Sequence, residues 1–174
     1  MDLLSEFRAA WPTTPYPGDR VLSDCWCDEC EFSVRHLRGK SWKEISTGDI
    51  GDEGGCMSPE AFRYYLPGIL ALSVQHPDEG HLASEINRRF VFSDHPHERR
   101  EARADLSRLV GALSPRQRKV LLYYFDWLAN QDWQAPILIS AAKRAVSDGV
   151  VEPFSFRELD AWNRRRAAEL RAGA

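Results

Sequence analysis

Serine and proline together mark the points at which this chain begins its helices. Residues 58–60 (Ser-Pro-Glu) supply a capping serine, a proline for the first helical position, and an acid beside the positive end of the helix dipole. Residues 114–117 (Ser-Pro-Arg-Gln) repeat the pattern, and residues 155–158 (Ser-Phe-Arg-Glu) form another capping box. Apolar residues then recur every three to four positions, and no run alternates with period two. The sequence therefore predicts an all-α fold.

The same spacing divides the chain into about seven short helices packed as one compact bundle. A chain of 174 residues, 43% of them hydrophobic, can bury a core without stabilising crosslinks. We expect a single helical domain over 1–174, with an N-terminal helix and proline-rich connector in 1–20 and the main bundle in 21–174. An acidic, glycine-rich loop without periodicity is expected over 41–56. Pro67 should kink or break its helix, because proline removes a backbone hydrogen bond.

The N-terminal residues, the apolar stretches and the net charge indicate where the chain is located and which classes of partner it can bind. The first six residues include acids where an export signal would carry lysine or arginine. No stretch approaches the roughly 18 continuous apolar residues of a membrane span, so the chain is expected to be cytoplasmic, with no membrane partner. The formal net charge of −3 argues against nucleic acid as a partner, because such binding depends on a basic surface.

Four cysteines offer either a metal site or part of the core. Cys25, Cys27 and Cys30 lie within six residues, and Cys56 could supply a fourth thiolate for tetrahedral zinc. The cluster contains one C-x-x-C pair rather than two, so no cofactor is predicted and zinc is kept as the alternative. The favoured interpretation places Cys27 and Cys30 on the buried stripe of a helix. Without an export signal, the thiols are expected to stay reduced.

Arg63, Tyr64 and Tyr65 form the first candidate for chemistry. An enzyme acting on a small anionic substrate could bind it with the arginine and orient it with the tyrosine hydroxyls. The structural interpretation pairs Arg63 with an acid of the preceding loop and buries the tyrosine rings in the core. The sequence contains none of the common nucleophile, phosphate-loop or zinc-protease motifs. The structural interpretation is therefore favoured, and no catalytic residue is predicted.

Residues 57–67, Met-Ser-Pro-Glu-Ala-Phe-Arg-Tyr-Tyr-Leu-Pro, resemble the hallmark of an uncharacterised family of small bacterial proteins. Members often carry Arg-Gly-Lys-x-Trp upstream, which residues 38–42 match, and Leu-Ser-Pro-x-Gln downstream, which residues 113–117 match. The three elements together span about half of the chain. The resemblance implies a helical bacterial protein and brings no established activity.

Charge is unevenly distributed along the chain. Residues 24–60 hold nine acidic and four basic residues, whereas residues 88–119 hold nine basic and four acidic ones. Such a separation can steer association with a charged protein, or it can neutralise itself within the fold. We expect a protein-interaction domain whose acidic face binds a protein partner. Small acidic bacterial proteins of this kind look similar to immunity proteins, which implies a cognate toxin as that partner. The residues expected to contact the partner are Asp24, Asp28, Glu29, Glu31, Asp49, Asp52 and Glu53.

Overall fold

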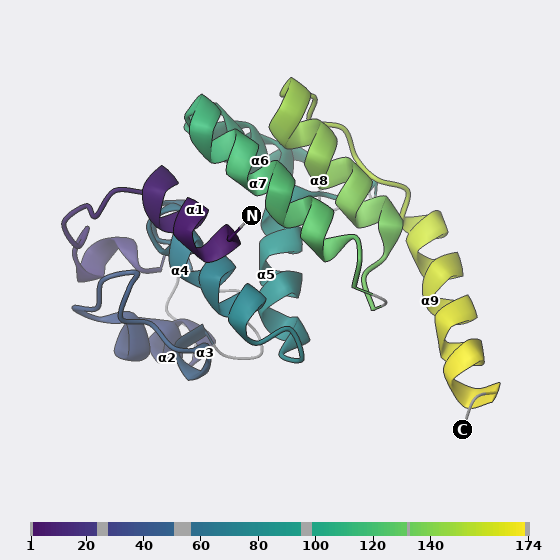
Figure 1. Ribbon diagram of the computed structural model, residues 1–174, viewed down its shortest axis with the longest axis horizontal. Helices are drawn as coiled ribbons and strands as arrows, with labels where there is room; N and C mark the ends of the chain where they lie inside the picture. The colour runs from purple at the N-terminus through teal and green to yellow at the C-terminus, as the bar shows by residue number, and fades with distance from the viewer. Residues whose placement is uncertain (1, 24–27, 51–56, 95–98, 132, 173–174) are drawn as a thin grey trace. The chain divides into compact units, whose positions relative to one another are not determined.

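The protein, seen in a computed structural model, is all-α (Figure 1), and the fold-class prediction is confirmed. The described residues are 2–23, 28–50, 57–94, 99–131 and 133–172. Across these ranges the chain forms nine α-helices, one 3-10 helix and a single isolated β-bridge, but no strand. The helices are α1 (Leu3–Ala10), η1 (Asp19–Val21), α2 (Asp28–Leu37), α3 (Thr47–Ile50), α4 (Pro59–Gln75), α5 (Gly80–Phe90), α6 (Arg99–Gly111), α7 (Pro115–Leu128), α8 (Pro136–Asp148) and α9 (Phe156–Ala172).

The chain divides into two compact units. The first comprises residues 1–86 and 114–120, and the second comprises residues 87–113 and 121–174. The predicted N-terminal helix is α1, and an extended segment follows it as expected. The single domain expected over residues 1–174 stays a prediction, because this division does not test whether the units fold independently.

Helix α4 carries much of the core of the first unit. The Ser58 Oγ accepts a hydrogen bond from the Ala61 N–H at 3.0 Å, and proline occupies the first turn, as the sequence predicts. Ten of the seventeen residues of α4 are buried, and both α1 and α3 pack against it. The helix runs through Pro67 without interruption, so the predicted break does not occur. Burial on several sides of α4 offsets the one backbone bond that proline removes.

The segment expected to be an irregular loop contains a short helix. Residues 47–50 form α3, a single turn that packs against α2 and α4. A helix of four residues is too short to show apolar periodicity, so its sequence carried no helical signal. Residues 51–56, which hold most of the glycines of the predicted loop, lie outside the described residues.

In the second unit, α6, α7 and α8 all contribute buried side chains. Leu121 and Phe125 of α7 are fully buried, as are Ala142 and Val146 of α8. Gly149 ends α8 with a φ of +68°, the left-handed stop that the sequence predicts.

The segment that leads into α9 is tied to the segment that follows α5. The Phe154 N–H donates to the Phe92 carbonyl oxygen, and the Asp94 N–H donates to the Phe154 carbonyl oxygen, both at 3.0 Å. The Phe156 N–H donates to the Asp94 carboxylate, also at 3.0 Å. Helix α9 then packs against α8. The structure describes all seventeen residues of α9, and none of them is buried.

Candidate functional site

Helix α2 presents an exposed face that combines acidic and aromatic side chains. Asp28, Glu31, Phe32 and Arg35 are all exposed and follow i, i+3, i+4, i+7 spacing, which places them on one side of the helix. Phe32 is 38% exposed, and its ring stacks on that of His36 with the centroids 3.8 Å apart. The His36 Nδ1 lies 2.9 Å from the Phe32 carbonyl oxygen, so the N–H tautomer at Nδ1 donates to it. We call these five residues the α2 face.

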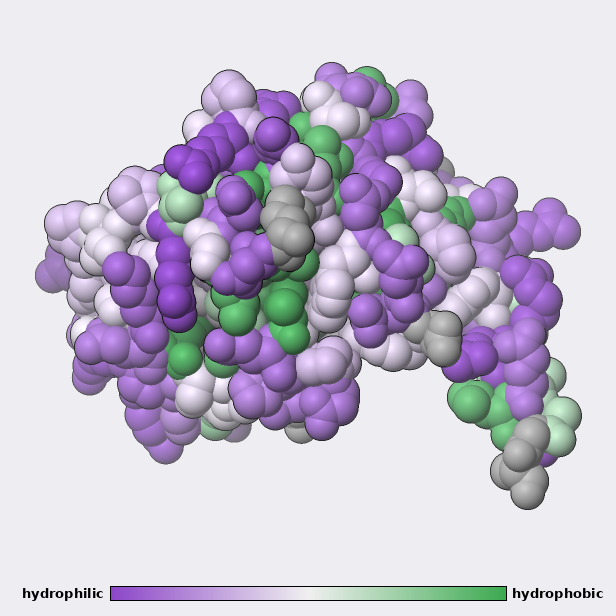
Figure 2. All heavy atoms as spheres, viewed as in Figure 1, coloured by the Kyte–Doolittle hydropathy of each residue, from purple (hydrophilic) through white to green (hydrophobic). Residues whose placement is uncertain are grey.

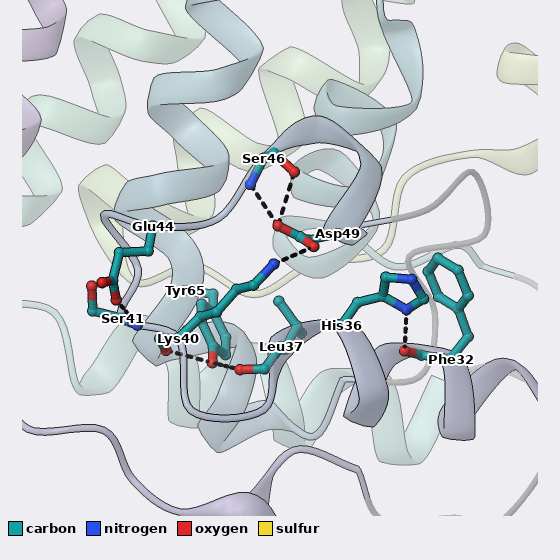
Figure 3. Close-up of polar contacts among 9 residues, drawn as sticks. All are labelled: Phe32, His36, Leu37, Lys40, Ser41, Glu44, Ser46, Asp49 and Tyr65. Atoms are coloured by element: carbon teal, nitrogen blue, oxygen red, sulfur yellow. Dashed lines mark hydrogen bonds and ion pairs between the residues drawn. The ribbon is translucent and has the colours of Figure 1, made fainter.

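The opposite side of α2 is fixed to the core. Cys30 and Leu37 are buried there, and Val34 is half-buried, as the predicted apolar stripe requires. The helix ends at Leu37, and Gly39, two residues later, has a φ of +71°, the left-handed conformation that commonly follows a helix end. The Tyr65 hydroxyl of α4 shares its proton between the carbonyl oxygens of Leu37 and Lys40, at 2.9 and 3.0 Å (Figure 3). The α2 face therefore lies on a helix whose C-terminal end is held by the Tyr65 hydroxyl.

A part-buried ion pair joins the turn after α2 to α3. The Lys40 Nζ lies 2.6 Å from Asp49 Oδ1, while the N–H and hydroxyl of Ser46 donate to Asp49 Oδ2 at 2.8 and 2.9 Å (Figure 3). Asp49 thus supplies the side-chain half of a capping box at the start of α3, by accepting from the Ser46 N–H. Burial opposes ionisation, but Lys40 and Ser46 outweigh it and hold the pKa of Asp49 below the ordinary value of 3.8. The carboxylate is charged at neutral pH and stabilises this corner of the fold.

We expect an Asp49→Asn variant to lose about 1–2 kcal/mol of stability at neutral pH, because it loses the ion pair and part of the capping box. A lowered folded-state pKa means that the contribution is complete above the unfolded value of 3.8 and is lost as pH falls through the folded-state pKa. Urea unfolding of both proteins across the acidic range measures this difference. A difference that stays constant from neutral to strongly acidic pH would contradict the charge-based explanation.

Three tyrosine rings pack together behind the turn that ends α2. The ring centroid of Tyr64 lies 4.9 Å from that of Tyr65 and 6.3 Å from that of Tyr16, both edge to face. The Tyr16 hydroxyl donates to Asp19 at 2.7 Å, and burial together with this bond raises the pKa of Tyr16 to about 12. Burial also raises the pKa of Tyr64 and Tyr65. Among the described residues, the buried Tyr64 hydroxyl has no hydrogen-bond partner of good geometry.

The adjacent tyrosines should respond differently to loss of the hydroxyl. Tyr65→Phe leaves two backbone carbonyls without their donor, so we expect it to cost about 1–2 kcal/mol. Tyr64→Phe removes a buried hydroxyl that gains little from hydrogen bonding, so we expect a change of less than about 0.5 kcal/mol. Denaturant unfolding of the two variants measures both effects. An equal loss in both would show that the Tyr64 hydroxyl contributes as much to stability as the Tyr65 hydroxyl, and would contradict this explanation.

The acidic residues predicted to contact a partner differ in their exposure to solvent. Asp28 and Glu31 are exposed on the α2 face, where Glu31 also pairs with Arg35 at 2.9 Å. Asp49 is only 5% exposed and is engaged by Lys40 and Ser46, so we do not retain it as a contact residue. Asp24, Asp52, Glu53 and the side chain of Glu29 lie outside the described residues, and for them the prediction stands as made.

Cys30 is buried and disulfide-bonded, so the prediction that its thiol stays free is wrong. That prediction depended on the cellular compartment, whereas disulfide formation depends on which sulfurs the fold brings together. A disulfide sulfur is not a thiolate and cannot ligate zinc. Cys25, Cys27 and Cys56 lie outside the described residues. Within the part of the chain that is described, no three His, Cys, Asp or Glu side chains gather as a metal site would require.

Arg63, Tyr64 and Tyr65 do not converge on one point. Arg63 is exposed on α4, whereas Tyr65 is fully buried and its hydroxyl holds the end of α2. The contacts of Tyr65 therefore support the interpretation that its ring is part of the core. The prediction that all three residues bind one anionic substrate therefore has no shared site to support it, and it stays a prediction.

One buried polar pair was not anticipated from the sequence. In the second unit, the Asn87 amide donates to the Gln134 side-chain oxygen at 2.6 Å, and both residues are buried. They lie 47 positions apart, so no local pattern could pair them. Such a bond offsets the cost of burying two amides and fixes one arrangement of the core around them.

Comparison with known proteins finds no match: no family model, no curated protein and no solved structure is similar to the chain. The resemblance to a bacterial family therefore stays an expectation. A separate finding concerns membranes: none of the helices in the described ranges combines the length and the apolar character needed to cross a bilayer.

Proposed function

We propose that this protein is a protein-interaction domain and that the α2 face binds a partner protein with a basic surface. One observation carries the proposal: Phe32, an aromatic residue, is exposed beside the exposed acids Asp28 and Glu31 on a helix whose other side is held by the core. Aromatic residues often dominate binding energy, and surrounding acids would favour a basic partner. The Tyr65 bond to the end of α2 supports this role, because a fixed helix loses little entropy on binding.

The particular form that we propose is an immunity protein, which blocks a toxin by covering a basic surface. Support comes from the small size of the chain, its net charge of −3 and the resemblance of residues 57–67 to a bacterial family. Acidic residues at exposed positions of α2 would speed association with a basic cleft through electrostatic steering. The partner would be encoded close to this protein, which makes the product of the neighbouring gene the first candidate.

Binding between the purified protein and that candidate tests the proposal. We expect Phe32→Ala to weaken binding by at least about 2 kcal/mol, roughly 30-fold in Kd. Glu31→Lys should weaken it as well, mainly by slowing association at low salt. Glu152→Lys, a charge reversal at an exposed acid in the second unit, is the matched control and should leave the affinity unchanged.

Two results would count against the proposal. Equal effects of Glu31→Lys and Glu152→Lys would indicate a response to net charge rather than binding at the α2 face. If Phe32→Ala bound the partner with full affinity, Phe32 would not be part of the interface. Circular dichroism and thermal unfolding of each variant establish that the helical fold is intact before binding is compared.

A cytoplasmic location is part of this proposal, and the disulfide at Cys30 makes it testable. Disulfides are rare in reducing compartments, so we expect the Cys30 disulfide to be reduced in protein taken from the cytoplasm of its host, which would then carry four free thiols. Alkylation at the moment of lysis, followed by mass spectrometry, counts them. A disulfide that persists in freshly alkylated protein would contradict the cytoplasmic location and leave the binding proposal unaffected.

A further inference from the structure

Helix α9 carries a stripe of exposed side chains. Phe156, Asn163, Ala167 and Leu170 follow i, i+7, i+11, i+14 spacing, which places them along one line of the helix. All four are exposed, Phe156 by 50% and Leu170 by 62%. Figure 2 shows hydrophobic atoms at the surface near the C-terminal end of this helix. We call these four residues the α9 stripe.

The α9 stripe is symmetric about its middle. Phe156 lies seven residues before Asn163, and Leu170 lies seven residues after it. If two copies of α9 packed antiparallel around a two-fold axis at Asn163, Phe156 of each copy would lie opposite Leu170 of the other. The two Asn163 side chains would meet at the axis, where each amide can donate to the other's carbonyl oxygen. The same stripe is thus complementary to itself in this register.

The charges beside the α9 stripe favour the same register. Asp160 and Arg164 lie on one flank and pair within the helix, with Arg164 Nη1 2.5 Å from Asp160 Oδ2. Across the two-fold axis, the antiparallel arrangement also brings Asp160 of each copy beside Arg164 of the other. On the other flank, Trp162 of each copy comes beside Arg166 of the other, as a cation–π contact requires.

We propose that the α9 stripe is a self-association surface, at which α9 of a second copy of this chain packs antiparallel to form a dimer. A helix of seventeen residues is about 26 Å long, so a pair of such helices buries less area than a standard interface of about 800 Å² per partner. The dimer should therefore be reversible and should form in proportion to protein concentration. This surface lies on α9 and does not depend on the proposed role of the α2 face.

Sedimentation equilibrium of the full chain over a wide concentration range tests the proposal. We expect the wild type to shift from monomer to dimer as concentration rises. Ala167→Glu places a charge on the α9 stripe where packing of the second copy would bury it, and it should weaken dimerisation at least about tenfold. Ala168→Glu makes the identical change at the next residue, about 100° around the helix and also exposed, and it should leave the dimer unaffected.

A charge exchange tests the register itself. Asp160→Arg alone should weaken the dimer, because it places arginine beside Arg164 of the other copy, whereas Asp160→Arg combined with Arg164→Asp should restore it. A wild type that stays monomeric at every concentration would overturn the proposal. So would equal effects of Ala167→Glu and Ala168→Glu, or a double variant no better than the single one. A different protein found bound to the stripe of a monomeric wild type would also overturn it.

Discussion

Replacing Gly68 with alanine is expected to lower the free energy of unfolding by about 3 kcal/mol or more. A Cβ at this position would overlap the Trp42 backbone oxygen and lie 2.7 Å from Ile45 Cδ1. Contacts this short force the backbone of residues 42–45 away from α4, where the neighbouring core residues Leu66 and Ile69 are fully buried. The higher helix propensity of alanine returns only about 1 kcal/mol. Denaturant unfolding at neutral pH measures the loss.

Gly48→Ala is the matched control for this prediction. Gly48 also lies in a helix of the first unit, but a Cβ there would meet no atom within 4 Å. Alanine at this position should therefore be neutral or slightly stabilising, by up to about 1 kcal/mol. Equal stability of the two variants would show that residues 42–45 do not pack on α4 as closely as described.

Truncating Phe125 to alanine should cost about 4 kcal/mol. The ring is fully buried in the second unit and meets the rings of Phe90 and Tyr124 edge to face, with centroid distances of 5.5 and 5.6 Å. The change removes the transfer free energy of the ring, leaves a cavity and breaks both aromatic contacts. Thermal and urea unfolding of the purified variant measure the loss, and reduced expression at growth temperature is expected with it.

Phe156→Ala makes the same chemical change at an exposed position of the same unit. Because half of that side chain is already in water, the expected cost to folding is below about 1 kcal/mol. The comparison is made at low protein concentration, so that self-association does not contribute to the measured stability. If the two truncations cost the same, Phe125 would not be a core residue of the second unit.

The helix boundaries were largely predictable because the interactions that set them are local. At Ser114, the backbone N–H donates to the Gln117 side-chain oxygen at 2.9 Å, and the Gln117 N–H returns a bond to the serine hydroxyl at 3.2 Å. These atoms lie within three residues of each other, so the sequence motif contains the whole interaction. The left-handed conformations of Gly39 and Gly149 are local in the same sense.

The candidate site was predictable only in part. The acidic character of α2 and its buried stripe follow from residue spacing, and Asp28 and Glu31 are exposed as a partner-binding role requires. The exposed aromatic of the α2 face was not singled out, although i, i+4 spacing from Asp28 to Phe32 was a signal that could have found it. The burial of Asp49 could not be anticipated, since it depends on Lys40 and on the packing of α3 against α4.

The sequence by itself determined the all-α class, the helix starts after serine and the stops at glycine, because each depends on atoms a few residues apart. Only the tertiary structure decided that Tyr65, and not Tyr64, uses its hydroxyl to bond the end of α2. It also decided that no side chain fits at Gly68 and that Asn87 pairs with Gln134. These contacts join residues 23 to 47 positions apart, and their free energy depends on distances that no local pattern of residues specifies.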